Sequence, residues 1–235
     1  MLARIENKVL EKYPETEIAY LVANVTVKKN ESFVNELKAG LIETVKAMGI
    51  DSTNLISHPN ISSWRKIYQN DFNVKTQSYN SSVEALLTRI VKGKKLWDIC
   101  NIVDLYNCCS ISHLLPMGGY DLNKVCGDIT IRFGQEGDNF LGLGRREPVV
   151  VESNHVIYAD DVKVLCWLWN YQDSSETCID ENTKEVLFFI DSIQQSTHQS
   201  LKKAIQELMS NLEKINGIPI NHGILNLNSP QAILK

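Results

Sequence analysis

The segment Trp167–Thr177 (WLWNYQDSSET) contains residue types that a small binding or catalytic site requires. Its two tryptophans are separated by one residue, so on a strand both rings would point the same way. A polar run with two carboxylates, Asp173 and Glu176, follows directly. A carboxylate beside a substrate can orient a water molecule and accept its proton. The pattern is typical of a pocket with an aromatic wall and a polar mouth, although two core tryptophans before a solvated turn are the commoner arrangement.

Signatures of other common chemistries are missing from the chain. It has no G-x-S-x-G elbow, no Walker loop and no H-E-x-x-H pair. Gly142–Arg145 (GLGR) is a lone G-x-G without a strand-helix-strand context, so we expect a turn there. The five histidines are scattered rather than grouped at ligand spacing. We therefore expect no metal site and no organic cofactor.

The cysteines do not follow a zinc or redox pattern, because none of the six forms a C-x-x-C pair. In a reducing compartment we expect them to be small buried hydrophobic residues. They are Cys100, Cys108, Cys109, Cys126, Cys166 and Cys178.

The composition is that of an ordinary globular domain. Hydrophobic residues make up 43% of the 235 residues and charged residues 22%. No apolar run is long enough to cross a bilayer, and the N-terminus lacks the apolar stretch of a secretory signal. We expect a soluble, cytoplasmic protein with no membrane partner.

The charge of the chain argues against general binding of nucleic acid, because the net charge is −4 and the pI is near 5.8. Any RNA contact would have to be local. The strongest candidate is the segment RIVKGKK with its four basic residues, and smaller groups are Arg145 with Arg146 and Lys202 with Lys203. A solvated surface is the commoner role for each group. The four candidate RNA-binding residues are Arg89, Lys92, Lys94 and Lys95.

Hydrophobic periodicity in the first part of the chain predicts alternating helices and strands. Residues 1–50 are predicted to form a helix over 2–13, a strand over 18–27 and a helix over 33–48 that stops at Gly49. Residues 51–80 are expected to be an ordered connection with a short helix around Trp64. Ser81–Glu84 (SSVE) has the spacing of a capping box at the start of a helix that ends near Gly93.

The rest of the chain alternates between helical and β-like patterns. A helix is predicted over 102–115, and Gly118-Gly119 after Pro116 predicts a turn with positive φ. An amphipathic helix is predicted over 201–215, followed by an irregular tail over 217–235. The pattern favours one α+β domain over 1–235, with a β-rich core and helices packed on it. The expected strands are 128–133, 149–152, 155–160, 164–169 and 185–191.

Several short blocks share their order and spacing with one known family. Asn101–Asp121 (NIVDLYNCCSISHLLPMGGYD) is followed by Asp121–Val125 (DLNKV), Val156–Asp160 (VIYAD) and Glu181–Leu187 (ENTKEVL). These blocks resemble the editing domain of the bacterial phenylalanyl-tRNA synthetase beta chain, most strongly over residues 97–192. With His58-Pro59, Trp64-Arg65 and the helix from Ser82, the chain also resembles free-standing B-three/B-four domain proteins over about residues 17–212.

The resemblance implies a fold and a function. The fold would be an unusual β-sandwich of short strands with flanking helices. The function would be to bind the aminoacyl 3′ end of mischarged tRNA in trans and to hydrolyse the ester without a cofactor. A synthetase that must reject an amino acid differing from its proper one by a single hydroxyl needs a second pocket, with polar groups placed to bind that hydroxyl.

The sequence also departs from the family pattern. Gly118 stands where the synthetase turn carries its histidine. The family segment M-G-G-E-x-S is replaced by Trp169–Thr177, and its glutamate falls on Ser175 by count, with Glu176 adjacent. The synthetase domain that the sequence resembles removes wrongly attached tyrosine. Because of these departures, the resemblance does not imply the same specificity for tyrosine here.

The resemblance and the polar run together give a set of candidate site residues. Glu176 or Asp173 would orient the attacking water, and the backbone N–H groups of Gly118 and Gly119 would hold the oxyanion. A helix cap or a turn bond is the alternative role for the polar residues. The remaining substrate-binding candidates are Asn107, Tyr120, Trp169, Asn170, Ser175 and Thr177.

Three functions remain open from the sequence. The first is a hydrolase that edits aminoacyl-tRNA. The second is a non-catalytic module that binds an amino acid, an aminoacyl end, a small metabolite or RNA. The third is an enzyme acting on a small molecule with a reused fold. We do not expect a complete synthetase, because the chain has none of the ATP-binding motifs of that enzyme class.

Overall fold

The fold is organised around a pair of long apolar strands. In the computed structural model, which describes residues 1–235, β2 (Glu17–Asn24) and β10 (Glu185–Ser192) pair antiparallel over all 8 residues of each strand. Both are rich in β-branched or aromatic residues, which suit a pleated and buried surface. β11 (Ile218–Leu225) pairs with the other edge of β2, and β3 (Met117–Asp121) pairs with the other edge of β10. The resulting antiparallel sheet has the order β11-β2-β10-β3.

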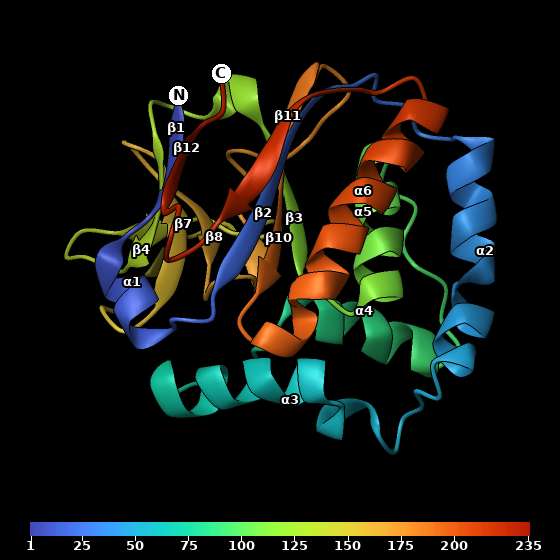
Figure 1. The fold of residues 1–235 in the computed structure, drawn as a ribbon, viewed down its shortest axis with the longest axis horizontal. Helices are drawn as coiled ribbons and strands as arrows, with labels where there is room; N and C mark the ends of the chain where they lie inside the picture. The colour runs from blue at the N-terminus through green and yellow to red at the C-terminus, as the bar shows by residue number, and fades with distance from the viewer.

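A second sheet is built from shorter strands and has the order β12-β1-β4-β7-β8-β9. β1 and β4 run parallel, whereas the other neighbours are antiparallel. Because β1 pairs with β12, the two chain ends lie side by side (Figure 1). The strands are Leu2–Ile5 (β1), Ile129–Phe133 (β4), Val156–Ala159 (β7), Val164–Trp167 (β8), Gln172–Asp173 (β9) and Gln231–Ile233 (β12).

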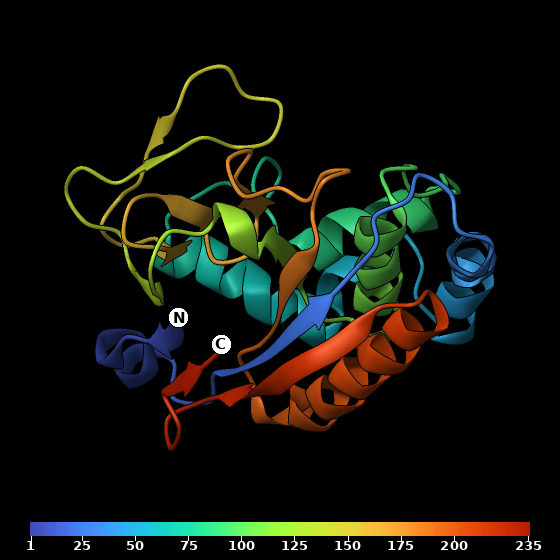
Figure 2. The same ribbon diagram turned by 90° about the horizontal axis from the view of Figure 1, so that it is seen from above.

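Two further strands, β5 (Asn139–Phe140) and β6 (Val149–Val150), pair only with each other. The segment that joins them projects from the body of the protein (Figure 2). Gly144 in this segment has a φ of 77°, so the predicted turn at the lone G-x-G is confirmed. The isolated bridge between Gly142 and Ser174 ties the base of the segment to the second sheet.

The helices gather mainly on one side of the four-stranded sheet (Figure 1). α5 and α6 pack on its outer face, and α2 and α4 pack on α5 in turn. None of the helices combines the length and the apolar character needed to span a bilayer. The helices are Asn7–Lys12 (α1), Ser32–Ala47 (α2), Pro59–Lys66 (α3), Ser82–Val91 (α4), Asn101–His113 (α5) and His198–Lys214 (α6).

Alternate residues of β2 contribute to different cores, as the pleat of a strand requires. Ile18, Tyr20 and Val22 lie in the core between the two sheets. Ala19 and Leu21 lie in the core between the four-stranded sheet and helices α5 and α6. The two sheets therefore form a sandwich with flanking helices, which confirms the expected α+β class.

The two chain ends differ from the sequence prediction. The helix predicted over 2–13 is wrong at its start, because Leu2–Ile5 forms β1 and α1 begins only at Asn7. The tail predicted to be irregular over 217–235 contains β11 and β12. Most of β11 is exposed or half-buried, so as an edge strand it lacks the run of buried apolar residues that marks a strand in sequence.

Two local predictions in the middle of the chain are also wrong. Gly118 and Gly119 lie inside β3, where pairing with β10 holds them extended, and neither has a positive φ. Ser81 precedes α4 but makes no capping hydrogen bond through its side chain. Glu84 returns no bond to this cap, since its Oε1 is paired with Arg65 of α3 and its Oε2 has no partner.

The cysteines follow the prediction in part. Four of the six are buried, and all six are free. The prediction that all would be buried is wrong for Cys126, which is exposed, and for Cys178, which is half-buried. Both lie in connections between strands, where small residues are often open to solvent.

A buried ion pair fixes α3 against α4. Arg65 donates from Nη1 to Glu84 Oε1 and from Nη2 to Thr76 Oγ1, the latter at 2.7 Å. Glu84 is only 3% exposed. Burial raises the pKa of Glu84, and the Arg65 charge opposes that rise. The pair thereby places Trp64, on the same helix as Arg65, relative to the first turn of α4.

We expect Arg65→Met to lower the free energy of unfolding by about 3 kcal/mol, because the substitution leaves Glu84 buried without a counter-charge. Chemical denaturation followed by circular dichroism measures this loss. The double variant R65M/E84L should recover most of it, since an apolar pair of similar volume removes the unpaired charge. A loss below about 1 kcal/mol in the single variant, as for an exposed pair, would contradict this account.

Candidate functional site

A small cavity lies between the two sheets, where strands β3, β7, β8, β9 and β10 come together. Its volume is about 50 Å³. A cavity needs only about 10–15 Å³ of accessible space to hold one water molecule, so this one has room for a small polar group. We call this cavity the aspartate pocket. It is lined by Ser82, Met117, Gly118, Tyr120, Tyr158, Cys166, Trp169, Asn170, Tyr171, Gln172, Asp173, Phe189 and Asp191.

Asp173, the last residue of β9, supplies the first of two carboxylates to the pocket. Tyr120 of β3 donates from Oη to Asp173 Oδ1 at 2.8 Å. Burial raises the pKa of Asp173 to about 6, although hydrogen bonds from Tyr120 and Cys166 act in the opposite direction. A carboxylate with a pKa close to neutral can accept and return a proton under physiological conditions.

Asp191, near the end of β10, supplies the second carboxylate. Tyr158 donates from Oη to Asp191 Oδ1, and Asn170 donates from Nδ2 to Oδ2 at 3.0 Å. Burial raises the pKa of Asp191 to about 7, and the negative charge of Asp173 adds to the rise.

The two carboxylates have no cationic partner in the protein. No lysine, arginine or histidine contributes to the pKa shift of either Asp173 or Asp191. Asp191 is buried and Asp173 is half-buried. Two acids that share one pocket in this way are stabilised by a shared proton or by a cation, because both cannot easily carry a charge. The pocket is therefore suited to the ammonium group of a ligand.

The backbone bends sharply where β8 ends beside the pocket. Leu168 and Trp169 have φ values of 51° and 65°, in the left-handed region that non-glycine residues rarely adopt. Such strain is concentrated at functional sites. Tyr68 holds the bend by donating from Oη to the Leu168 carbonyl at 2.7 Å.

The bend separates the two tryptophans that were predicted to form one aromatic wall. Trp169 lines the pocket and contacts Trp64 of α3, with 5.3 Å between the ring centroids. Trp167 remains on β8 and packs against Phe140 and Tyr79 outside the pocket. The prediction of a shared wall is therefore wrong, because Trp169 no longer belongs to the strand.

Three residues of the pocket carry buried polar atoms without a hydrogen-bond partner in the protein. These atoms are Ser82 Oγ, Trp169 Nε1 and Gln172 Oε1. Ser82 is held at the pocket by its backbone N–H, which donates to the Asn170 carbonyl at 2.9 Å. Leaving such atoms unpaired costs about 1–3 kcal/mol each. All three belong to residues that line the pocket.

Gly118 keeps space open at the pocket. A Cβ atom here would lie 2.9 Å from Tyr120 Oη and 3.3 Å from Asp173 Oδ1. Any side chain would therefore disturb the hydrogen bond between these two residues. The glycine is needed for this close approach and not for a turn.

The two glycine N–H groups point to opposite edges of β3. Asp121 donates from its N–H to the Thr177 carbonyl, on the edge away from β10. Because N–H groups alternate along a strand, the Gly119 N–H faces the same outer edge and the Gly118 N–H faces β10. This arrangement does not favour an oxyanion hole formed by both glycines.

The structure brings some of the predicted site residues together and leaves others apart. Asp173, Gly118, Tyr120, Trp169 and Asn170 all line the pocket. The others lie outside its lining: Gly119 is next to Tyr106 and Ile179, Asn107 is half-buried on α5, Ser175 donates to the Leu141 carbonyl, Glu176 is exposed, and Thr177 is buried with its hydroxyl unpaired.

The candidate RNA-binding residues lie near the other end of α4. Arg89 is in the last turn of the helix, and its guanidinium lies 4.1 Å from the ring centroid of the exposed Trp97. Ser82 begins the same helix at the pocket. A separation of seven residues in a helix is about 10 Å along its axis, with both residues on a similar face. Lys92, Lys94 and Lys95 follow and are exposed.

Sequence reasoning missed several pocket residues, most importantly Asp191. A signal for it was present, because Asp191 has the same strand parity as Phe189 and Leu187, whose side chains face the core between the sheets. A carboxylate in this position had to be buried. The bend at Leu168 and the role of Ser82 carried no comparable signal, since both depend on contacts between distant segments.

The raised pKa of Asp191 gives a testable dependence of stability on pH. The folded state holds a proton between the ordinary value of 3.8 and about 7, whereas the unfolded state does not. This group therefore makes the free energy of unfolding fall as pH rises, by up to about 1.4 kcal/mol per pH unit. We expect Asp191→Asn to remove this slope, measured by urea denaturation between roughly pH 5 and roughly pH 7.

Asp138→Asn is the matched control for this measurement. Although burial acts against it, the hydrogen bond from Arg132 lowers the pKa of Asp138 below 3.8. This carboxylate is ionised in both states across the tested range, so its removal should leave the slope unchanged. Asp173, whose pKa is raised to about 6, keeps a slope of its own below about pH 6 in D191N. A slope between about pH 6 and about pH 7 that is unchanged in D191N would therefore show that Asp191 is not the group that holds the proton.

Comparisons with known proteins agree with the resemblance in the sequence. Residues 67–217 match the B3/4 domain family. The phenylalanine-tRNA ligase beta subunit of Chromobacterium violaceum is 32% identical over 92 residues, which are 39% of this chain and 12% of that protein. The same subunit of Fusobacterium nucleatum is 30% identical over 136 residues, which are 58% of this chain and 16% of that protein.

One solved structure aligns with most of this chain. It is an N-terminal fragment of the phenylalanyl-tRNA synthetase beta subunit from Pyrococcus horikoshii, with a TM-score of 0.48 and 11% identity over 92% of this chain and 49% of that chain. The chain thus spans only a small part of the ligase subunits that it matches. The family match, however, covers more than half of the chain. This protein belongs to the B3/4 domain family.

Proposed function

We propose that the aspartate pocket receives the aminoacyl end of a tRNA and that the protein hydrolyses the ester in trans. The observation that carries this proposal is the pair of carboxylates that line the pocket, buried Asp191 and half-buried Asp173, neither of which forms an ion pair with a cation of the protein. The α-ammonium group of an aminoacyl ester supplies such a cation. Membership of the B3/4 family, with relatives named as phenylalanine-tRNA ligase beta subunits, supports tRNA as the carrier.

The size of the pocket supports entry by the ammonium end. A cavity of about 50 Å³ holds an ammonium group, but the amino-acid side chain and the ribose remain at the mouth. Asp191 binds the ammonium group, which stabilises the ionised carboxylate against the effect of burial. The unpaired Ser82 Oγ and Gln172 Oε1 provide further hydrogen bonds.

Asp173 is the base of the proposed reaction. It accepts a proton from a water molecule, and the water oxygen bonds to the ester carbonyl carbon. The bond between that carbon and the ribose oxygen then breaks, and the ribose oxygen takes the proton. The products are the free amino acid and the tRNA with its terminal hydroxyl restored. A pKa of about 6 leaves Asp173 largely ionised at neutral pH.

The basic residues near the end of α4 are the proposed contact for the tRNA backbone. The helix leads from Ser82 at the pocket to Arg89, Lys92, Lys94 and Lys95. The exposed Trp97 beside Arg89 offers a ring on which a base can stack. Arg145 provides a further basic contact for the tRNA outside the pocket, where its guanidinium lies 5.8 Å from the ring centroid of Trp167. Its segment is joined to β9 by the hydrogen bond from Gln172 Nε2 to the Leu143 carbonyl, at 2.9 Å.

Binding without hydrolysis is the second candidate function. The opposite directions of the Gly118 and Gly119 N–H groups favour it, because the reaction then lacks a pair of backbone donors for the oxyanion. In this alternative the same carboxylates hold an ammonium group and no water attacks. The experiment below separates the two functions.

We expect the protein to release amino acid from at least one member of a panel of correctly and wrongly charged tRNAs. Asp173→Asn should lower the rate by about 10²–10⁴-fold, and the wild-type rate should rise with pH through about 6 as Asp173 ionises. Glu181→Gln, which changes an exposed carboxylate of the same connection, should have no effect.

Two outcomes would contradict this assignment. A loss of rate in Glu176→Gln with full activity in D173N would transfer the role of base to the exposed Glu176. Retained binding of charged tRNA without release from any member of the panel would exclude hydrolysis and favour the binding function.

A second prediction concerns the tRNA contact. Lys94→Glu with Lys95→Glu should weaken tRNA binding at least about ten-fold and reduce the salt dependence by about one to two counterions. Lys202→Glu with Lys203→Glu makes the same change in net charge on the exposed face of α6 and is the matched control. Equal weakening by both double variants, measured by filter binding, would show that only the total charge matters.

A further inference from the structure

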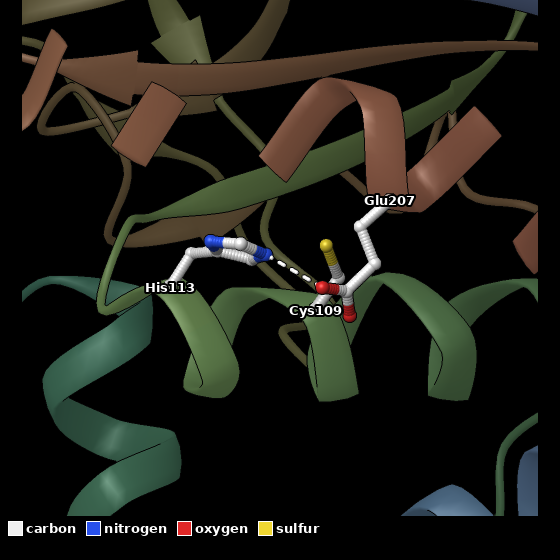
Figure 3. A group of neighbouring side chains, drawn as sticks. All are labelled: Cys109, His113 and Glu207. Carbon is white, nitrogen blue, oxygen red and sulfur yellow. Dashed lines mark hydrogen bonds and ion pairs between the residues drawn. The ribbon is translucent and has the colours of Figure 1, made fainter. Parts of the chain in front are cut away.

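Three side chains of different chemistry converge between helices α5 and α6. Cys109 and His113 are four residues apart on α5, so they lie on the same face of the helix. Glu207 reaches them from α6. Figure 3 shows the sulfur, the imidazole ring and the carboxylate pointing toward one another.

The distances are close to those of a metal site. His113 Nε2 lies 2.9 Å from Glu207 Oε2, and one donor atom from each of the three residues lies within 4.8 Å of the others. Zinc bonds of about 2.0–2.3 Å place tetrahedral ligands roughly 3.5 Å apart. Side-chain rotations that move the donor atoms by about 1 Å are therefore enough to close the site around an ion.

We propose that Cys109, His113 and Glu207 bind one zinc ion that links α5 to α6. A thiolate, an imidazole and a carboxylate form a donor set that suits zinc better than magnesium or calcium, which prefer oxygen alone. Three protein ligands leave the fourth position for water. The His113 side chain is 13% exposed and that of Glu207 is 43% exposed, so an ion can enter from solvent on this side.

Binding changes the local contacts in a defined way. The Cys109 thiol gives its proton to solvent, and the sulfur then forms the bond to zinc. The hydrogen bond between His113 and Glu207 is replaced by one bond from each residue to the metal. The present partner of the thiol is weak, because Cys109 Sγ lies 3.5 Å from the Ala204 carbonyl.

The proposed zinc site is separate from the aspartate pocket. Cys109 belongs to the core between α5, α6 and the four-stranded sheet, whereas the pocket aromatics belong to the core between the two sheets. Zinc at this position connects two helices and has no contact with the proposed substrate. Its presence or absence therefore does not decide the proposed hydrolysis.

The test is a zinc titration of the metal-free full-length protein against a chromophoric chelator. We expect one zinc ion per chain. His113→Gln and Glu207→Gln, both at partly exposed positions, should weaken zinc binding at least about ten-fold, and Cys109→Ala should weaken it at least about a hundred-fold. Cobalt should give a charge-transfer band from the thiolate that is absent in C109A.

Two variants are matched controls. Cys108→Ala removes the neighbouring thiol, which lies in the core toward α4, and Glu213→Gln removes an exposed carboxylate of α6. Both should bind zinc and cobalt like the wild type. If the wild type binds no zinc, or if H113Q and E207Q bind it as tightly as the wild type, the group is only an ion pair beside a core cysteine. H113Q and E207Q keep the test decisive even if C109A does not fold.

Discussion

The full-length pairing of β2 with β10 is the interaction on which the rest of the structure depends. Each of these strands is buried on both faces, so each contributes to two cores at once. One face meets the second sheet, and the other face meets α5 and α6. A shift of the register by one residue would exchange the two sets of side chains and place Asp191 on the helical side. The position of the aspartate pocket thus follows from this register.

The same pairing explains how the protein tolerates buried acids. Asp191 lies at the end of a strand whose other residues are almost all apolar, and its backbone N–H donates to the Pro116 carbonyl at 3.0 Å. Tyr158 and Asn170 satisfy its oxygens from the second sheet. The surrounding sheets hold the carboxylate in place despite the free-energy cost of its burial. A buried residue that lowers the stability of the fold, as Asp191 does, is expected at functional sites.

The sequence allowed the long elements to be predicted because they carry either a helical period or a continuous apolar run of strand length. α2 and α6 each bury one apolar face, β2 and β10 are buried on both faces, and each of the four was predicted close to its observed bounds. β1 and β12 were missed because such short strands are defined by their partners, which lie more than a hundred residues away in the chain. A local pattern cannot contain that information.

Only part of the candidate site could likewise be predicted from the sequence. The polar run after Trp169 indicated Asp173 and Asn170, which do line the cavity. The side-chain direction of Trp169 was wrong, because the left-handed bend at Leu168 depends on Tyr68, a residue 100 positions away. The proposed zinc site was not predicted for the same reason, since Glu207 is 94 residues from His113 in the chain. Spacing rules find ligands only when they share one segment.

Gly118 connects the departure from the family pattern to the geometry of the site. In the family that the sequence resembles, a histidine stands at this position, and here the backbone passes so close to Tyr120 and Asp173 that a side chain would have to displace one of them. The space that an imidazole would need is occupied by a hydrogen bond between a phenol and a carboxylate. Under the proposed function, proton transfer in this pocket would use a carboxylate, and burial brings the pKa of Asp173 to about 6, the range in which an imidazole works. In the proposed reaction, Asp173 would accept the proton that a histidine accepts in the related domain, without standing at the position of that histidine.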